Sequence, residues 1–263
     1  MNEPQGAPEL TGNMFLFNKP ELLAKEQHGQ LGLSKPSKRY GFCSAVRAIP
    51  ITVTEIPAAS KDYPIIFTSK EQLLPLAVVG VVDEVNLFVD ENGEWEQNRY
   101  VPGYLRRYPF GVAAETGGER MAVVIDRDYE GLTENSEFPL FENGEPTKVS
   151  NDAVEFCKAF ERERQMTDDF AKRLAAFDIV HAQSAQFTPE GENEAKSFAD
   201  YFGIDENKLK ALADEQVVEL HKSQFLPLLY AMLMSMANWR QLLARRAARY
   251  GFTEANMVSS PLN

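Results

Sequence analysis

The sequence predicts an α+β protein, with an antiparallel β-sheet half followed by a long helix and a C-terminal helical subdomain. Two observations lead to this prediction. Between about residues 40 and 126, short apolar runs are separated by turn residues, a pattern typical of strands. From Asp152 onward, apolar residues recur every three or four positions, which is the period of a helix.

The first half is expected to be an irregular arm followed by strands. Residues 1–38 are rich in Pro, Gly, Lys and Glu and show no sustained period, so they predict the arm. Residues 39–263 are expected to form a single domain, β-rich over 39–150 and helical over 151–252. The Asn92-Gly93 pair predicts a type I′ hairpin turn, and Asn143-Gly144 predicts a second turn. The expected strands are Ala48–Thr54, Ile65–Thr68, Leu76–Val82, Asn86–Val89 and Met121–Ile125.

A long helix is expected from Asp152 to Asp178, because Asp152 and Glu155 have the spacing of a capping box. Apolar side chains then follow at helical spacing, but polar ones interrupt them in the middle of the helix. These polar side chains could face a pocket, or they could satisfy one another across successive turns. They are Glu161, Arg164, Thr167 and Asp168.

The remaining helices are predicted from their ends. Asp205 and Asp214 are each expected to cap a short helix. The segment Phe225–Trp239 contains no charged residue, yet it is too short to cross a bilayer, so it predicts a buried core helix. Gly251 marks the expected end of this last helical segment.

The segment Tyr100–Phe110 is the strongest candidate for a recognition element. It places two adjacent arginines in an uncharged, aromatic surround framed by prolines. A guanidinium group suits a carboxylate or a phosphate, and tyrosine rings can stack on it. Alternatively, the arginines pair with surface carboxylates while the tyrosines pack. The expected ligand-binding residues are Tyr100, Tyr104, Arg106, Arg107, Tyr108 and Arg164.

Charge limits the partners that the protein can bind. The net charge of −12 argues against general nucleic-acid binding, which needs clustered cations. Between His221 and Phe252 there are no acidic residues. The arginines of this segment predict a docking surface for an acidic partner or anionic lipid, or they serve the helix macrodipole. They are Arg240, Arg245, Arg246 and Arg249. The N-terminus has no secretory signal, which favours a cytoplasmic location.

Catalytic patterns are not found in the sequence. The histidines His28, His181 and His221 are widely separated and none has a ligand-spaced partner, so no metal, cofactor or catalytic residue is predicted. The motifs of common hydrolases, NTPases and dinucleotide-binding enzymes are also missing. Cys43 and Cys157 are expected to be free thiols. Three carboxylates at expected strand ends suit either an active site or a turn, namely Asp83, Asp90 and Asp126.

An ordered set of segments resembles the bacterial SapC family over about residues Tyr40 to Arg249. Relatives in this family are often encoded near outer-membrane receptors, cupin-type hydroxylases and flavin-dependent halogenases. The resemblance therefore implies a link with surface uptake or with peptide and tryptophan-derivative modification. It does not extend to the membrane permease of peptide transporters that shares the name. The segments are Tyr63-Pro-Ile-Ile-Phe67, Pro75-Leu-Ala-Val-Val-Gly80, Asn86-Leu-Phe-Val-Asp90, Gly93-Glu-Trp95, Tyr100–Phe110, Phe160-Glu161, Arg164, Thr167, Phe170, Leu228-Leu-Tyr-Ala231 and Asn238-Trp239.

We therefore expect a non-catalytic accessory or binding protein that recognises a carboxylate-bearing small molecule or peptide. Two other classes stay open. One is an oxygenase or hydrolase with a site built from His181 or His221 and nearby acids such as Asp178. The other is a structural interaction protein of the cell envelope.

Overall fold

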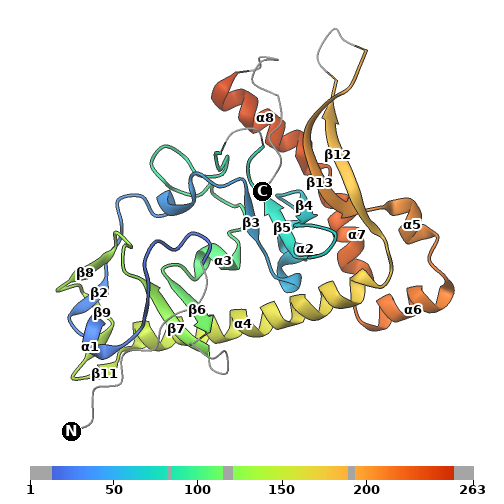
Figure 1. Ribbon diagram of the computed structural model, residues 1–263. Helices are drawn as coiled ribbons and strands as arrows, with labels where there is room; N and C mark the ends of the chain where they lie inside the picture. The colour runs from blue at the N-terminus through green and yellow to red at the C-terminus, as the bar shows by residue number, and fades with distance from the viewer. Residues whose placement is uncertain (1–13, 82–83, 115–120, 189–192, 252–263) are drawn as a thin grey trace. The chain divides into compact units, whose positions relative to one another are not determined.

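The computed structural model describes residues 14–81, 84–114, 121–188 and 193–251, which form two compact units (Figure 1). Unit 1 comprises the described parts of residues 1–39 and 105–161, and unit 2 those of residues 40–104 and 162–263. Strands precede the long helix and the C-terminal helices, so the predicted α+β class is confirmed. The single domain expected over residues 39–263 stays a prediction, because two compact units can still unfold as one cooperative domain.

Unit 1 is built from short antiparallel strands around one apolar core. One three-stranded sheet has the order β1-β7-β6 and another has the order β8-β2-β9, while β10 and β11 form a hairpin. The core consists of Leu31, Phe110, Ile125, Leu132, Leu140 and Cys157. The elements are β1 (Pro20–Leu22), α1 (Lys25–His28), β2 (Leu31–Leu33), β6 (Phe110–Ala114), β7 (Met121–Asp126), β8 (Leu132–Glu134), β9 (Phe138–Pro139), β10 (Phe141–Glu142) and β11 (Glu145–Pro146).

The described part of the expected irregular arm, residues 14–38, is instead part of the fold of unit 1. It supplies β1, α1 and β2, and both strands pair with partners about a hundred residues away in the sequence. The buried carboxylate of Asp126 accepts main-chain hydrogen bonds from Asn18 at 3.0 Å and Lys19 at 2.9 Å. The composition of residues 1–38 predicted an irregular arm because the strands and the carboxylate that stabilise this segment lie about a hundred residues away in the sequence.

Unit 2 contains a five-stranded antiparallel sheet of order β12-β13-β4-β5-β3. Its two longest strands, β12 and β13, form a hairpin that lies in the half of the chain expected to be helical (Figure 1). Helix α7 packs against β4 and β13. The elements are η1 (Gly41–Cys43), β3 (Ala48–Pro50), η2 (Val53–Glu55), α2 (Ile56–Ala59), β4 (Ile65–Phe67), β5 (Pro75–Val78), β12 (Val180–Phe187), β13 (Lys196–Ile204), α5 (Glu206–Lys210), α6 (Asp214–Lys222), α7 (Leu226–Ser235) and α8 (Asn238–Tyr250).

Two helices include residues of both units, namely α3 (Gly103–Arg106) and α4 (Lys148–Ala175). The expected capping box at Asp152 is wrong, because α4 begins four residues earlier and Asp152 pairs with Lys148 one turn away. The expected core helix Phe225–Trp239 is divided between α7 and α8, and Gly251 ends α8 as predicted, with φ of 75°. Only one face of α7 is buried, since Met234 is 78% exposed.

Both Asn-Gly turns are present, and only the one at Asn92-Gly93 differs in type from the expectation. Asn143 and Gly144 both have positive φ, of 52° and 81°, which is the type I′ geometry between β10 and β11. At Asn92-Gly93 a turn does connect Val89 and Trp95, but of the two turn residues only Gly93 has positive φ. The carboxylate of Asp90 holds this turn by accepting hydrogen bonds from the main-chain N–H groups of Asn92 and Glu94.

No helix within the described residues is both long and apolar enough to span a bilayer. The longest helix, α4, carries charged side chains along its length. Helix α7 is apolar but has only ten residues.

Candidate functional site

A groove in unit 2 lies between α8 and the segment Leu87–Glu96, and we call it the α8 groove. Its volume is about 680 Å³, which is in the range of pockets that hold small molecules. Residues with aromatic, acidic and basic side chains all contribute to its wall. The lining residues are Leu87, Phe88, Val89, Asp90, Glu91, Glu94, Trp95, Glu96, Arg245, Ala248 and Arg249.

The aromatic part of the groove is a stack held by the core of unit 2. The rings of Phe88 and Trp95 lie 5.9 Å apart with an interplanar angle of 19°. Tyr63, which is fully buried, meets Phe88 edge-on at 4.7 Å, and its burial raises the pKa of its hydroxyl. The guanidinium of Arg245 lies 4.4 Å from the centre of the Phe88 ring, a cation–π distance. The aromatic wall is therefore preorganised.

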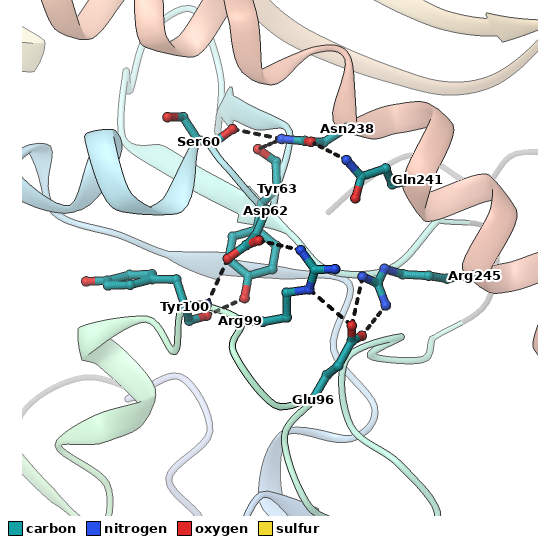
Figure 2. Close-up of polar contacts among 9 residues, drawn as sticks. All are labelled: Ser60, Asp62, Tyr63, Glu96, Arg99, Tyr100, Asn238, Gln241 and Arg245. Carbon is teal, nitrogen blue, oxygen red and sulfur yellow. Dashed lines mark hydrogen bonds and ion pairs between the residues drawn. The ribbon is translucent and has the colours of Figure 1, made fainter.

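A chain of alternating charges supports the groove (Figure 2). Both terminal nitrogens of Arg245 donate to the carboxylate of Glu96, with Nη2 lying 3.1 Å from Oε1. Arg99 donates to Glu96 through Nε at 3.1 Å and to Asp62 through Nη1 at 3.0 Å. Burial acts to raise the pKa of Glu96, but the hydrogen bonds from Arg245 and Arg99 outweigh it and hold this pKa below its usual value.

The same network fixes the segment that leads to Tyr100. The second carboxylate oxygen of Asp62 accepts the main-chain N–H of Tyr100 at 2.8 Å, and the hydroxyl of Tyr63 donates to the carbonyl of Tyr100. On the α8 side, Nδ2 of Asn238 donates to the carbonyls of Ser60 at 2.8 Å and Tyr63 at 3.1 Å (Figure 2). The residues following α2, the loop before Tyr100 and α8 are thus tied together within unit 2.

The charged rim of the groove contains a guanidinium that has no carboxylate partner among the described residues. Nη1 of Arg249 donates to the carbonyls of Asn86 at 3.3 Å and Val89 at 3.0 Å, and no described carboxylate pairs with this guanidinium. Opposite charges lie on the loop, where Asp90, Glu91 and Glu94 line the groove. The rim therefore offers both a cation and carboxylates to a ligand.

Three of the six residues expected to bind a ligand belong to unit 2. The hydroxyl of Tyr100 donates to the buried carboxylate of Glu55 at 2.8 Å, and Tyr104 is half-buried. Arg164 is 48% exposed and donates to Asp168 at 2.7 Å, one turn along α4. Its helix neighbour Thr167 is buried and accepts the main-chain N–H of Val53 at 2.8 Å. Of the two arrangements expected for the polar residues of this helix, Arg164 and Asp168 show the pairing across one helical turn.

The other three residues belong to unit 1. Arg107 is only 9% exposed, and its guanidinium lies 4.6 Å from the centre of the Phe160 ring. The hydroxyl of Tyr108 donates to Asp126 at 2.9 Å, and burial followed by this carboxylate raises the pKa of Tyr108. Arg106 is exposed and lies 5.6 Å from the Phe156 ring. Three of the six expected residues thus lie in each unit. Their grouping into one ligand-binding site stays a prediction.

The arginines of α8 were singled out in the sequence only for their charge. The structure gives them different surroundings, since Arg246 is 3% exposed, Arg245 is paired with Glu96, and Arg240 is exposed. Arg245 and Arg249 lie four residues apart, so they share one face of α8. That spacing was the available signal for the groove. Nothing local pointed to Glu96 as the partner of Arg245.

The histidines, the cysteines and the acids at expected strand ends lie in different surroundings. His28 is fully buried in unit 1, whereas Nε2 of His181 lies 2.6 Å from Nζ of Lys208 in unit 2. Among the described residues, no three His, Cys, Asp or Glu side chains are grouped to hold a metal ion, and the expectation of no metal stays a prediction. Burial raises the pKa of the free thiols of Cys43 to about 12 and Cys157 to about 11. Asp83 lies outside the described residues.

Comparison with known proteins gives one match. The model of the SapC family matches residues 23–242. This range includes residues of both units, begins within the segment expected to be an irregular arm and ends before Arg245 and Arg249 of the α8 groove. No curated protein and no solved structure matches the chain.

Proposed function

Because the chain belongs to the SapC family, whose match spans both units, we propose an accessory binding protein of the cytoplasm that recognises a carboxylate-bearing small molecule or peptide. The α8 groove is the proposed site. The observation that carries the proposal is the guanidinium of Arg249 on the rim, which contacts main-chain carbonyls but no described carboxylate. A ligand carboxylate would supply the charged partner that no described residue gives to this arginine.

The acids of the rim narrow the proposal to a zwitterionic ligand. Asp90, Glu91 and Glu94 would repel a simple anion, but they would attract an amine on the same molecule that presents its carboxylate to Arg249. The aromatic wall of Phe88 and Trp95 would hold an apolar side chain between the two charged ends. An amino acid derivative or a short peptide has this combination of groups.

Binding of a dipeptide tests this proposal. We expect glycyl-phenylalanine, with both termini free, to bind more tightly than its N-acetylated or C-amidated form in isothermal titration calorimetry. Arg249→Gln should weaken binding about tenfold or more, since it removes a charge-assisted contact. Arg240→Gln is the matched control, because Arg240 is an exposed arginine of α8 that does not line the groove. Equal affinity of both variants, or no preference among the three peptides, would contradict the proposal.

An acidic protein partner at α8 is a secondary proposal, supported by Arg240. This residue is exposed and no described carboxylate pairs with it, whereas Arg245 is paired and Arg246 is buried. If a partner docks there, Arg240→Glu should abolish its co-purification at low salt, and raised salt should weaken the wild-type complex. A complex that survives both changes would exclude the charge-based interaction.

A further inference from the structure

The five-stranded sheet of unit 2 has two edge strands, and they are protected very differently. Strand β3 is three residues long and ends in Pro50. Its short length and its proline both disfavour pairing with a strand of another chain. Strand β12 is eight residues long and has one described neighbour, β13. Its sequence, Val-His-Ala-Gln-Ser-Ala-Gln-Phe, contains no proline, lysine, arginine or carboxylate. Only the register shift between Ala185 and Gln186 interrupts this edge.

The hydrogen bonding of the hairpin shows which main-chain groups of β12 face outward. The N–H of Asp205 donates to the carbonyl of Ile179 at 2.8 Å, in line with the register that pairs Val180 with Ile204. Hydrogen-bonded and non-hydrogen-bonded pairs alternate along an antiparallel ladder. The N–H and C=O groups of Val180, Ala182 and Ser184 therefore point away from β13. Ala182 and Ser184 are also exposed, whereas Val180 at the start of the strand is buried.

We propose that two copies of the protein associate through β12, in an antiparallel pair with its twofold axis at Ala182. In this register Ala182 faces Ala182 of the second copy, and Val180 faces Ser184. Ala182 of each strand then exchanges two main-chain hydrogen bonds with its counterpart across the axis, and four more form between Val180 and Ser184 if the pairing uncovers the main chain of Val180, which is 3% exposed in the single copy. Such pairing joins the two sheets into one continuous sheet.

A second copy is favoured over another partner because the strand is complementary to itself. Around the axis, His181 of one copy lies beside Gln183 of the other, so no two charged side chains of β12 face each other. The chain carries a net charge of −12, so two copies repel one another over most of their surfaces. The side chains of β12 include no lysine, arginine or carboxylate, and Lys208, which contacts His181, is paired with Asp178, so the edge adds little like-charge repulsion. Closed twofold pairing also consumes the exposed edge and stops at the dimer.

Sedimentation equilibrium of the full chain tests the proposal. The wild-type protein should reach twice the 29.6 kDa mass of one chain as its concentration rises. Ala182→Pro should give a monomer, because it removes an outward N–H that the hairpin does not use. Ala182→Lys should weaken the dimer about tenfold or more, since it places like charges opposite one another at the axis. Ala244→Lys is the control, as Ala244 is an exposed alanine of α8 in the same unit.

A cross-link gives an independent measurement of the register. Residues facing each other at a hydrogen-bonded antiparallel pair have Cα atoms about 5.5 Å apart, within the range of a disulfide. Ala182→Cys should therefore form a covalent dimer on mild oxidation, while Ala244→Cys should not. Cys43 and Cys157 are fully buried and do not compete. A wild-type protein that stays monomeric, a dimer that persists in both Ala182→Pro and Ala182→Lys, or a missing cross-link would overturn the proposal.

Discussion

At the scale of single residues, the α8 groove depends on a few polar side chains with several partners each. Glu96 binds two arginines, and Asn238 binds two main-chain carbonyls (Figure 2). Their neighbours Glu91 and Gln241 are exposed and make few contacts. These neighbours therefore serve as matched controls for the two residues.

Replacing Glu96 should weaken the pH dependence of the free energy of unfolding in the acidic range. The folded-state pKa of Glu96 lies below its usual value near 4.5, so its pairing stabilises the protein above that pH and this stabilisation is lost as the pH falls through the folded-state pKa. Glu96→Gln should cost about 1 kcal/mol at neutral pH, a modest value because Glu96 is 35% exposed. Urea unfolding from pH 7 to pH 3 measures the difference, which should shrink below about pH 4.5.

Glu91→Gln should leave the pH dependence of the unfolding free energy unchanged, since Glu91 has no ion pair among the described residues. A constant difference between wild type and Glu96→Gln across the whole pH range would show that the ion pairs do not carry the effect.

Replacing Asn238 should destabilise unit 2 strongly. Asn238 is 5% exposed, and Asn238→Leu leaves the carbonyls of Ser60 and Tyr63 without their donor. We expect a loss of about 2–3 kcal/mol in the free energy of unfolding, the cost of unsatisfied buried carbonyls. Gln241→Leu should cost less than about 0.5 kcal/mol, because Gln241 is exposed. Equal costs in urea unfolding would mean that Asn238 does not anchor α8.

At the scale of elements, similar sequence signals had different outcomes. Asp205 and Asp214 both precede short helices and both predicted N-caps. The carboxylate of Asp205 accepts the main-chain N–H groups of Asn207 at 2.9 Å and Lys208 at 3.2 Å, so it caps α5. In α6 the cap position is Ala213, whose N–H is bound by the side chain of Gln216, and Asp214 lies in the first turn.

Alanine substitutions should separate these two roles. Asp205→Ala should cost about 1 kcal/mol, because two N–H groups at the start of α5 lose their acceptor. Asp214→Ala should cost only about 0.3–0.5 kcal/mol, the contribution of an acid near a helix N-terminus. Thermal unfolding followed by circular dichroism measures both variants, and a larger effect at Asp214 would contradict the assignment.

At the scale of the whole molecule, the question is whether the two units unfold together. Both tryptophans, Trp95 and Trp239, lie in unit 2, so their fluorescence reports on that unit alone. Leu140 is fully buried in the core of unit 1. Because α3 and α4 include residues of both units, we expect the units to unfold as one cooperative domain.

Leu140→Ala tests this cooperativity. It should lower the free energy of unfolding by about 2–5 kcal/mol, the usual cost of a cavity in a core. In one cooperative domain, tryptophan fluorescence and far-ultraviolet circular dichroism shift together. A fluorescence transition at the wild-type urea concentration, with an earlier transition seen only by circular dichroism, would show that the units are independent.

The sequence by itself determined the features that depend on neighbours along the chain. The α+β class, the helical stripe of α4, the cap at Asp205, the end of α8 at Gly251 and the turn at Asn143-Gly144 follow from local periodicity and backbone preference. These signals depend on residues only a few positions apart, and their physical causes act over the same distance.

Only the tertiary structure decided the features that depend on distant partners. Strand β12 lacks a strong strand propensity, and its pairing with β13 supplies what its own sequence does not. The segment 14–38 is ordered by β7 and Asp126, and Arg245 meets Glu96 from 149 positions away. Ion pairs and sheet ladders form between groups that the fold brings together. Sequence spacing could therefore identify the arginines of α8, but only the fold decided which of them is buried, which is paired and which lines the groove.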